Sequence, residues 1–223
     1  MITNWKELKI RHLLQIQEIG ELQLASDDEK NLMVAALLAD IPYEQMLLMP
    51  LDDVRTYMDN AAFLLEEPKH EKTRKHYYVN GHKYKLFKNA AEMTVAQYLD
   101  FQSVWKDGFD KRPAEMLSIF LIPDGHEYND GYDKDEVMED MYDLPVVEGL
   151  GIADFFTKRF ARLMRAGLMY CRLRMKWLRL TAKKENREMY KALDIQMNLV
   201  IRELEQVYKY GCPAWKQSLT LPS

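Results

Sequence analysis

The sequence predicts a mainly α-helical protein made of two related three-helix units, a β-hairpin between them and a long C-terminal helical hairpin. Apolar residues recur at helical spacing through most of the 223 residues, which predicts helices. Two stretches about 85 residues apart also follow nearly the same plan, ELKIRHLLQIQEI at 7–19 and EMTVAQYLDFQSV at 92–104. Self-similarity at a fixed spacing is typical of one supersecondary unit used twice.

The similarity continues through the rest of both units. MVAALL at 33–38 corresponds to MLSIFL at 116–121, and DDVRTYM at 52–58 corresponds to DEVMEDM at 135–141. We therefore expect each unit to bury its apolar face against its neighbours. Most of the apolar pattern then belongs to the scaffold.

The first unit covers residues 1–66 and contains three predicted helices. Residues 7–22 have apolar positions mostly at helical spacing. Ser26 precedes three acidic residues and predicts a helix start, because a serine caps free N–H groups and acids favour the positive helix end. That helix should end near Ala39, before the Ile41-Pro42 step, and a third should run from Asp52 to Leu65.

Residues 67–89 form a charged linker with a β-hairpin. Asn80-Gly81 lies between two aromatic and β-branched runs, which is a strong signal for a two-residue hairpin turn. His76 and His82 flank this turn. They could face each other across the hairpin, but an ordinary exposed strand pair is the favoured interpretation.

The second unit covers residues 90–145 and ends in an acidic loop. Thr94 should cap a helix to about Asp107, and Pro113 should open a helix that Pro123 ends. Residues 124–143 then carry nine Asp and Glu against Lys134 alone.

Residues 146–223 are predicted to form the C-terminal helical hairpin and a tail. Residues 152–184 follow one long helical pattern, and a second helix follows at 185–210. The second helix has apolar residues at alternating spacings of three and four, which predicts a packing seam: Tyr190, Leu193, Met197, Val200, Leu204 and Val207.

A row of basic residues is the sharpest surface feature of the sequence. At 100° per residue its members fall on one side of the long helix, with no acid between Asp154 and Glu185: Lys158, Arg162, Arg165, Arg172, Lys176, Arg179 and Lys183. This basic stripe could follow the phosphates of a nucleic acid. A protein partner or the acidic segment 124–143 is the favoured alternative, since the net charge is −4. A basic amphipathic helix can also lie on an anionic membrane, although we expect no membrane partner.

Catalytic and metal-binding signatures are absent from the sequence. It has no glycine-rich phosphate loop, no nucleophile elbow and no paired-cysteine motif, and the five histidines share no metal-ligand spacing. No stretch of 18 uninterrupted apolar residues occurs, so no membrane-spanning helix is expected. We therefore expect no enzyme activity, no cofactor and no metal.

The order of elements resembles a family of phage proteins. ITNWKEL, FLLEEP, NGHKY, MTVAQYLDF and MLSIFLIP follow one another along residues 2–123. Over about residues 1–145 the chain resembles the tail assembly chaperone-like proteins encoded among the morphogenesis genes of tailed bacteriophages. The resemblance implies a non-enzymatic role in virion assembly, in which such proteins are thought to shield apolar helices of the tape-measure protein and bring tail-tube subunits to it.

These patterns together predict protein–protein contact as the function. The expected partners are phage tail or connector proteins, with a homo-oligomer compatible, in the host cytoplasm or in the virion. The alternative is a nucleic-acid-associated structural protein that uses the basic stripe. The candidate contact residues are apolar or aromatic positions on the hairpin and on the first helix of the second unit: Tyr78, Tyr84, Phe87, Tyr98, Phe101 and Trp105.

Overall fold

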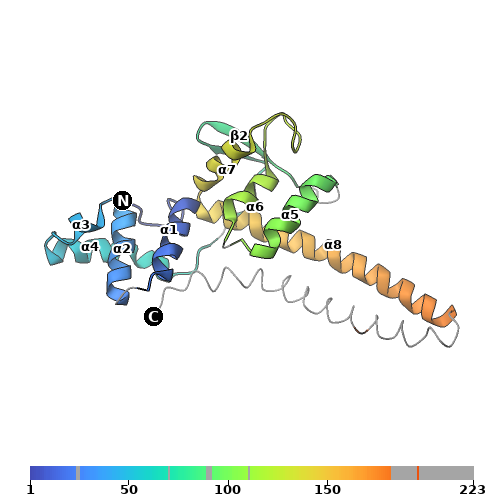
Figure 1. The fold of residues 1–223 in the computed structure, drawn as a ribbon, viewed down its shortest axis with the longest axis horizontal. Coiled ribbons are helices and arrows are strands. Elements are labelled where there is room, and N and C mark those ends of the chain that lie inside the picture. Colours follow the sequence, from blue (N-terminus) through green and yellow to red (C-terminus); the bar gives the residue numbers. More distant parts are fainter. Residues whose placement is uncertain (24–25, 70, 89–91, 110, 182–194, 196–223) are drawn as a thin grey trace. The chain divides into compact units, whose positions relative to one another are not determined.

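The computed structural model describes residues 1–23, 26–69, 71–88, 92–109, 111–181 and 195 (Figure 1). Two compact units divide the chain: one contains Met1–Ala153 and the other spans Asp154–Pro213. The described residues are mainly helical and include a small three-stranded antiparallel sheet, all of it in the first unit. The mainly helical fold class is therefore confirmed.

Four helices and a 3₁₀ turn open the first unit. They are α1 (Ile10–Glu21), α2 (Asp27–Ala39), α3 (Tyr43–Met46), α4 (Leu51–Ala61) and η1 (Ala62–Leu65). The predicted cap at Ser26 is confirmed, because its side chain accepts a hydrogen bond from the Glu29 backbone at 3.3 Å. The left-handed backbone of Asp40 ends α2 just after the predicted residue. Helix α2 packs on α1, α3 and α4, and its small residues Ala35 and Ala36 are buried with Met46.

The hairpin forms where the sequence predicts it. Strands β1 (His76–Val79) and β2 (His82–Leu86) are joined by Asn80 and Gly81, which have φ of 49° and 84°. Positive φ at both central residues is the type I′ geometry that matches strand twist. His76 lies opposite Lys85 and His82 lies opposite Val79, so the two histidines are not cross-strand partners.

A third strand replaces the predicted end of a helix. Helix α6 (Pro113–Phe120) stops at Phe120, and β3 (Leu121–Pro123) pairs antiparallel with β2. The prediction that this helix continues to Pro123 was therefore wrong. A short apolar run has no period that separates strand from helix, and the exposed edge of β2 supplies the missing hydrogen-bond partners.

Helices α5 (Val95–Asp107) and α7 (Lys134–Tyr142) enclose α6. The Thr94 side chain caps α5 as predicted, accepting a hydrogen bond from the Gln97 backbone at 3.1 Å. Phe101 and Phe120 pack with ring centroids 5.4 Å apart. The buried Gln97 amide donates to the Ile119 carbonyl at 2.7 Å, which ties α5 to the C-terminal end of α6.

Helix α8 (Val146–Thr181) begins inside the core of the first unit. Val146, Val147 and Leu150 are buried. The Val146 N–H donates to the Leu8 carbonyl at 2.7 Å, so the chain entering α1 pairs with the chain entering α8. This pairing fastens the N-terminal helices to the rest of the unit, which extends past the predicted boundary at 145.

The segments paired by sequence similarity all contribute to helices. They lie in α1 and α5, in α2 and α6, and in α4 and α7. Helix α2 packs on α1 and α4, and α6 packs on α5 and α7. The equivalence of the two sets stays a prediction, and the predicted second helix at 185–210 lies outside the described residues apart from Ile195. In the described part of the chain no helix combines the length and apolar character that a membrane span needs.

Candidate functional site

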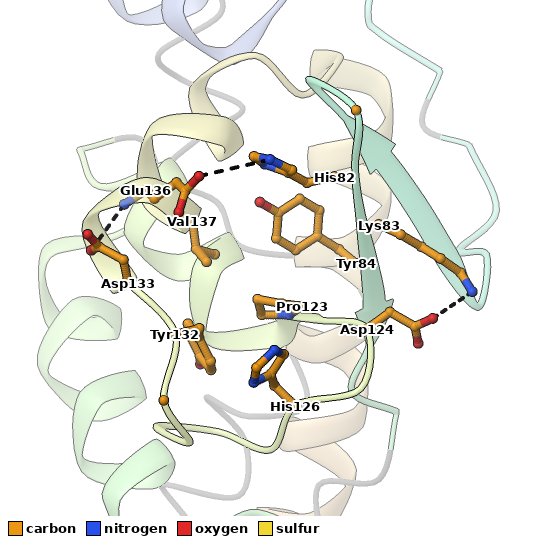
Figure 2. A pocket seen from close by; sticks show the side chains of 12 residues that line it. His82, Lys83, Tyr84, Pro123, Asp124, His126, Tyr132, Asp133, Glu136 and Val137 are labelled. Carbon is orange, nitrogen blue, oxygen red and sulfur yellow. Dashed lines mark hydrogen bonds and ion pairs between the residues drawn. The ribbon is translucent and has the colours of Figure 1, made fainter.

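An open cavity of about 630 Å³ lies between the hairpin, the loop after β3 and α7 (Figure 2). Strand β2 supplies one wall, and the N-terminal part of α7 supplies another. The loop that connects β3 to α7 closes the remaining side. The lining consists of Gly81, His82, Lys83, Tyr84, Pro123, Asp124, His126, Gly131, Tyr132, Asp133, Glu136 and Val137.

Asp140 of α7 fixes the hairpin behind this cavity. One carboxylate oxygen accepts the Tyr84 hydroxyl and lies 2.7 Å from Nδ1 of His82. The other oxygen accepts the Asn80 side-chain amide at 2.9 Å. Burial opposes the charge of Asp140, but the hydrogen bonds from Tyr84, Asn80 and His82 keep its pKa below the ordinary value. The hydrogen bond between His82 and Asp140, together with the negative charge of Asp140, raises the pKa of His82.

Charged pairs and aromatic rings form the rim. Figure 2 shows His82 and Glu136 facing each other at one end, with Nε2 and Oε1 3.9 Å apart. At the other end the rings of His126 and Tyr132 meet edge to face, with centroids 5.9 Å apart. Tyr84 lies between the two ends and is almost fully buried.

Two further carboxylates of the rim are held by neighbours. The Lys83 ammonium lies 2.6 Å from Asp124. Asp133 caps α7 by accepting the backbone N–H groups of Asp135 and Glu136 at 2.9 and 3.4 Å. Such caps place a negative charge at the positive end of the helix.

The lining carries ionisable and aromatic side chains. It contains no Ser, Thr or Cys, but its Lys, His, Tyr, Asp and Glu side chains are of types that enzymes use as nucleophiles, acids or bases. Among the residues that the structure describes, no group of three His, Cys, Asp or Glu side chains could hold a metal ion. The cavity therefore offers hydrogen-bond acceptors, one ammonium group, imidazoles and phenol rings.

A second cluster, of charged side chains around Asp143, lies next to the hairpin turn and was not predicted from the sequence. Asp143 accepts hydrogen bonds from Lys9 and Arg11 at 2.9 Å each and from Asn80 at 3.0 Å. Burial opposes the charge, but these donors hold the pKa of Asp143 at about 2. Glu139 adds a more exposed contact to Arg11 at 3.1 Å. The acidic segment 124–143 thus finds partners on the N-terminal strand-like entry to α1 and on the hairpin. That it covers the basic stripe stays a prediction.

The predicted contact residues separate into two groups. Tyr78 is 72% exposed, and Phe87, Tyr98 and Trp105 are half-buried. Tyr84 and Phe101, by contrast, are core residues at 2% and 1% exposure, so they offer no surface to a partner. Their aromatic character was taken for a contact surface, whereas the missed strand β3 and the Phe101–Phe120 packing bury them.

Two members of the basic stripe have described side chains. Lys158 pairs with Asp154 one helical turn away at 2.7 Å, and Arg162 is exposed. Lys183 lies outside the described residues, and the side chains of Arg165, Arg172, Lys176 and Arg179 lie outside what the structure describes. The role of the stripe stays a prediction.

Three exposed leucines form a surface that the sequence analysis missed. Leu47, Leu48 and Leu51 follow α3 and open α4, with exposures of 56%, 87% and 75%. The adjacent Met46 is fully buried, so the segment is anchored while its leucines face water. The sequence signal for this surface was the run LLMPL at 47–51, which has three leucines in a short connection between two helices. We call Leu47, Leu48 and Leu51 the leucine patch.

Comparisons of this chain with protein-family models, with curated proteins and with solved structures find no match.

Proposed function

We propose that this chain is a non-enzymatic assembly protein that binds an apolar segment of another protein, and that its resemblance to tail assembly chaperone-like proteins assigns it to bacteriophage virion assembly. The observation that supports binding is the leucine patch. Burying one leucine side chain contributes about 1.5–3 kcal/mol. Burial of these three exposed leucines by a partner would therefore contribute favourable binding energy.

The surroundings of the patch favour a partner with basic flanks. Glu44 precedes the leucines, and Asp52 and Asp53 follow them in the first turn of α4. Complementary charge raises association rates and selects against acidic partners. An amphipathic helix with apolar residues at helical spacing and flanking Lys or Arg would match both the leucines and these acids.

Co-expression with neighbouring tail proteins tests this proposal. The wild-type chain should retain one of them in a pull-down, and Leu48→Glu should lose it because a charge would enter the contact. Leu65→Glu is the matched control, since Leu65 is 77% exposed but lies at the other end of α4, in η1. Retention of the same partner by Leu48→Glu, or equal loss in both variants, would contradict a role for the patch.

Nucleic-acid binding through α8 is the second candidate. It is supported by the run of basic residues with no acid between Asp154 and Glu185. Each phosphate neutralised should lower the binding constant by about 0.9 log unit per log unit of salt. Undetectable or salt-independent DNA binding would exclude this candidate.

A further inference from the structure

We propose that the cavity between the hairpin and α7 binds a guanidinium group, either an arginine side chain of a polypeptide or a small guanidine. This site is separate from the leucine patch and does not depend on the proposed function. Its volume of about 630 Å³ is within the range of roughly 300–1,000 Å³ typical of ligand sites.

The charges of the lining select a cation. Its basic side chains all have partners: Lys83 lies 2.6 Å from Asp124, His82 lies 2.7 Å from Asp140, and Nδ1 of His126 lies 2.9 Å from the Asp130 carbonyl oxygen. Two further carboxylates line the cavity: Glu136, whose Oε1 lies 3.9 Å from Nε2 of His82, and Asp133, which caps α7. An anion would have to displace one of these pairs, whereas a cation can be added to them.

The shape of the lining favours a planar cation over a compact ammonium. Tyr132 and His126 place aromatic rings at one end of the cavity, apart from Glu136 (Figure 2). A guanidinium group stacks on such rings and donates forked hydrogen bonds to a carboxylate. Glu136 is the acceptor best placed for this, because its side chain is 63% exposed.

The walls of the cavity are held in place before any ligand arrives. Asp140 fixes Tyr84 and His82 from behind, and the cap by Asp133 fixes the start of α7. A ligand therefore does not have to order these elements, which removes part of the usual cost of binding.

A titration of the isotope-labelled full chain, followed by NMR, tests the proposal. The probes are a blocked arginine, Nα-acetyl-arginine methylamide, and its citrulline analogue, which replaces the guanidinium by a neutral urea of similar shape. The arginine probe should shift the signals of His82, His126 and Tyr132 with a dissociation constant of roughly millimolar order, as expected for one side chain. The citrulline probe should leave these signals unchanged. Equal shifts with both probes, or no shift with either, would overturn the proposal.

Two variants locate the binding. Glu136→Gln should weaken arginine binding by about threefold, which is the scale of a partly exposed ion pair. Glu127→Gln is the control, since Glu127 belongs to the same loop region but does not line the cavity. An unchanged dissociation constant in Glu136→Gln, with the chain still folded by its spectrum, would also overturn the assignment.

Two further probes separate the sources of the guanidinium. Tighter binding of a short peptide with one central arginine assigns the site to a polypeptide ligand. Tighter binding of agmatine, a small guanidine that also carries one ammonium group, assigns the site to a small-molecule ligand. Either result supports the guanidinium site, and stronger binding of a lysine peptide than of the arginine peptide would contradict it.

Discussion

Asp143 is the residue whose replacement should most clearly weaken the first unit. Its carboxylate is 16% exposed and joins three segments of the chain, the entry to α1, the hairpin turn and the end of α7. In Asp143→Asn, Lys9 and Arg11 keep an amide oxygen as acceptor but lose the negative charge that they share. Their ammonium and guanidinium groups would then face one another without the intervening negative charge.

The pKa of Asp143 sets the size of the effect. A decrease from 3.8 to about 2 corresponds to roughly 2 kcal/mol, at about 1.4 kcal/mol for each pH unit. Lys9 and Arg11 are 44% and 39% exposed, so water screens part of the attraction. We expect Asp143→Asn to lower the free energy of unfolding by about 1–2 kcal/mol.

Urea unfolding of the full chain measures this loss. Replacing Trp177 and Trp215 by phenylalanine leaves Trp5 and Trp105, both in the first unit, as the fluorescent reporters. With a slope of about 2 kcal/mol per molar urea, the midpoint should fall by about 0.5–1 M. Glu139→Gln is the matched control, because Glu139 contacts the same Arg11 but is 66% exposed. Its effect should stay below about 0.5 kcal/mol.

The pH dependence gives an independent check with a defined sign. The pKa of Asp143 is lower in the folded chain, so its contribution is present above about pH 4 and is lost as the pH falls toward 2. Wild-type chain should therefore lose more stability over this interval than Asp143→Asn does. Equal losses in the two chains, or equal effects of Asp143→Asn and Glu139→Gln, would refute this account of the cluster.

Two more predictions follow from single positions. A Cβ at Gly151 would lie 2.3 Å from the Glu71 carbonyl oxygen, so Gly151→Ala should destabilise the first unit by about 1–3 kcal/mol in the same urea assay. A Cβ at Gly20, in helix α1, would have no atom within 4 Å, so Gly20→Ala should raise the free energy of unfolding by up to about 1 kcal/mol. A larger loss of stability in Gly20→Ala than in Gly151→Ala would contradict the packing described. The His82 ring should titrate by NMR with its midpoint above 6.5, because Asp140 stabilises the imidazolium, and this stabilisation is lost as the pH rises through that midpoint. Asp140→Asn should move the midpoint down, and an unchanged midpoint would exclude Asp140 as the cause.

Local signals predicted the elements whose cause is local. Ser26 and Thr94 each satisfy a backbone N–H three residues ahead, and Asn80-Gly81 adopts the positive φ angles that a tight hairpin turn needs. These interactions lie within a few residues of each other. The sequence alone therefore carried enough information to place them.

The errors occurred where a distant partner decides the conformation. Residues 121–123 are a strand because β2 offers an edge about 40 residues earlier in the sequence. Asp143 is a partly buried anchor because Lys9 and Arg11, more than 130 residues away, meet it. Neither contact leaves a periodic signal in the sequence, so the acidic segment was predicted only as a negative surface that could meet the basic stripe.

The leucine patch was missed for a different reason. The sequence analysis ascribed most of the apolar pattern to the scaffold and did not single out these leucines, because apolar residues are most often buried. Met46 follows that rule, but its neighbours Leu47 and Leu48 do not. The exposure of these leucines depends on the direction in which α4 leaves α3. The spacing of the leucines does not determine that direction.

The structure changes how the charge of the acidic segment can act. Of its nine acids, at least five already have partners in the first unit: Asp124, Asp133, Glu139, Asp140 and Asp143. Asp143 is paired with the cationic groups of Lys9 and Arg11, so its charge adds little to a long-range field. A basic helix seeking a negative partner would therefore meet a weaker surface than the sequence implied. By the same reasoning the leucine patch, with Glu44, Asp52 and Asp53 beside it, becomes the more attractive acidic and apolar surface for a basic amphipathic segment.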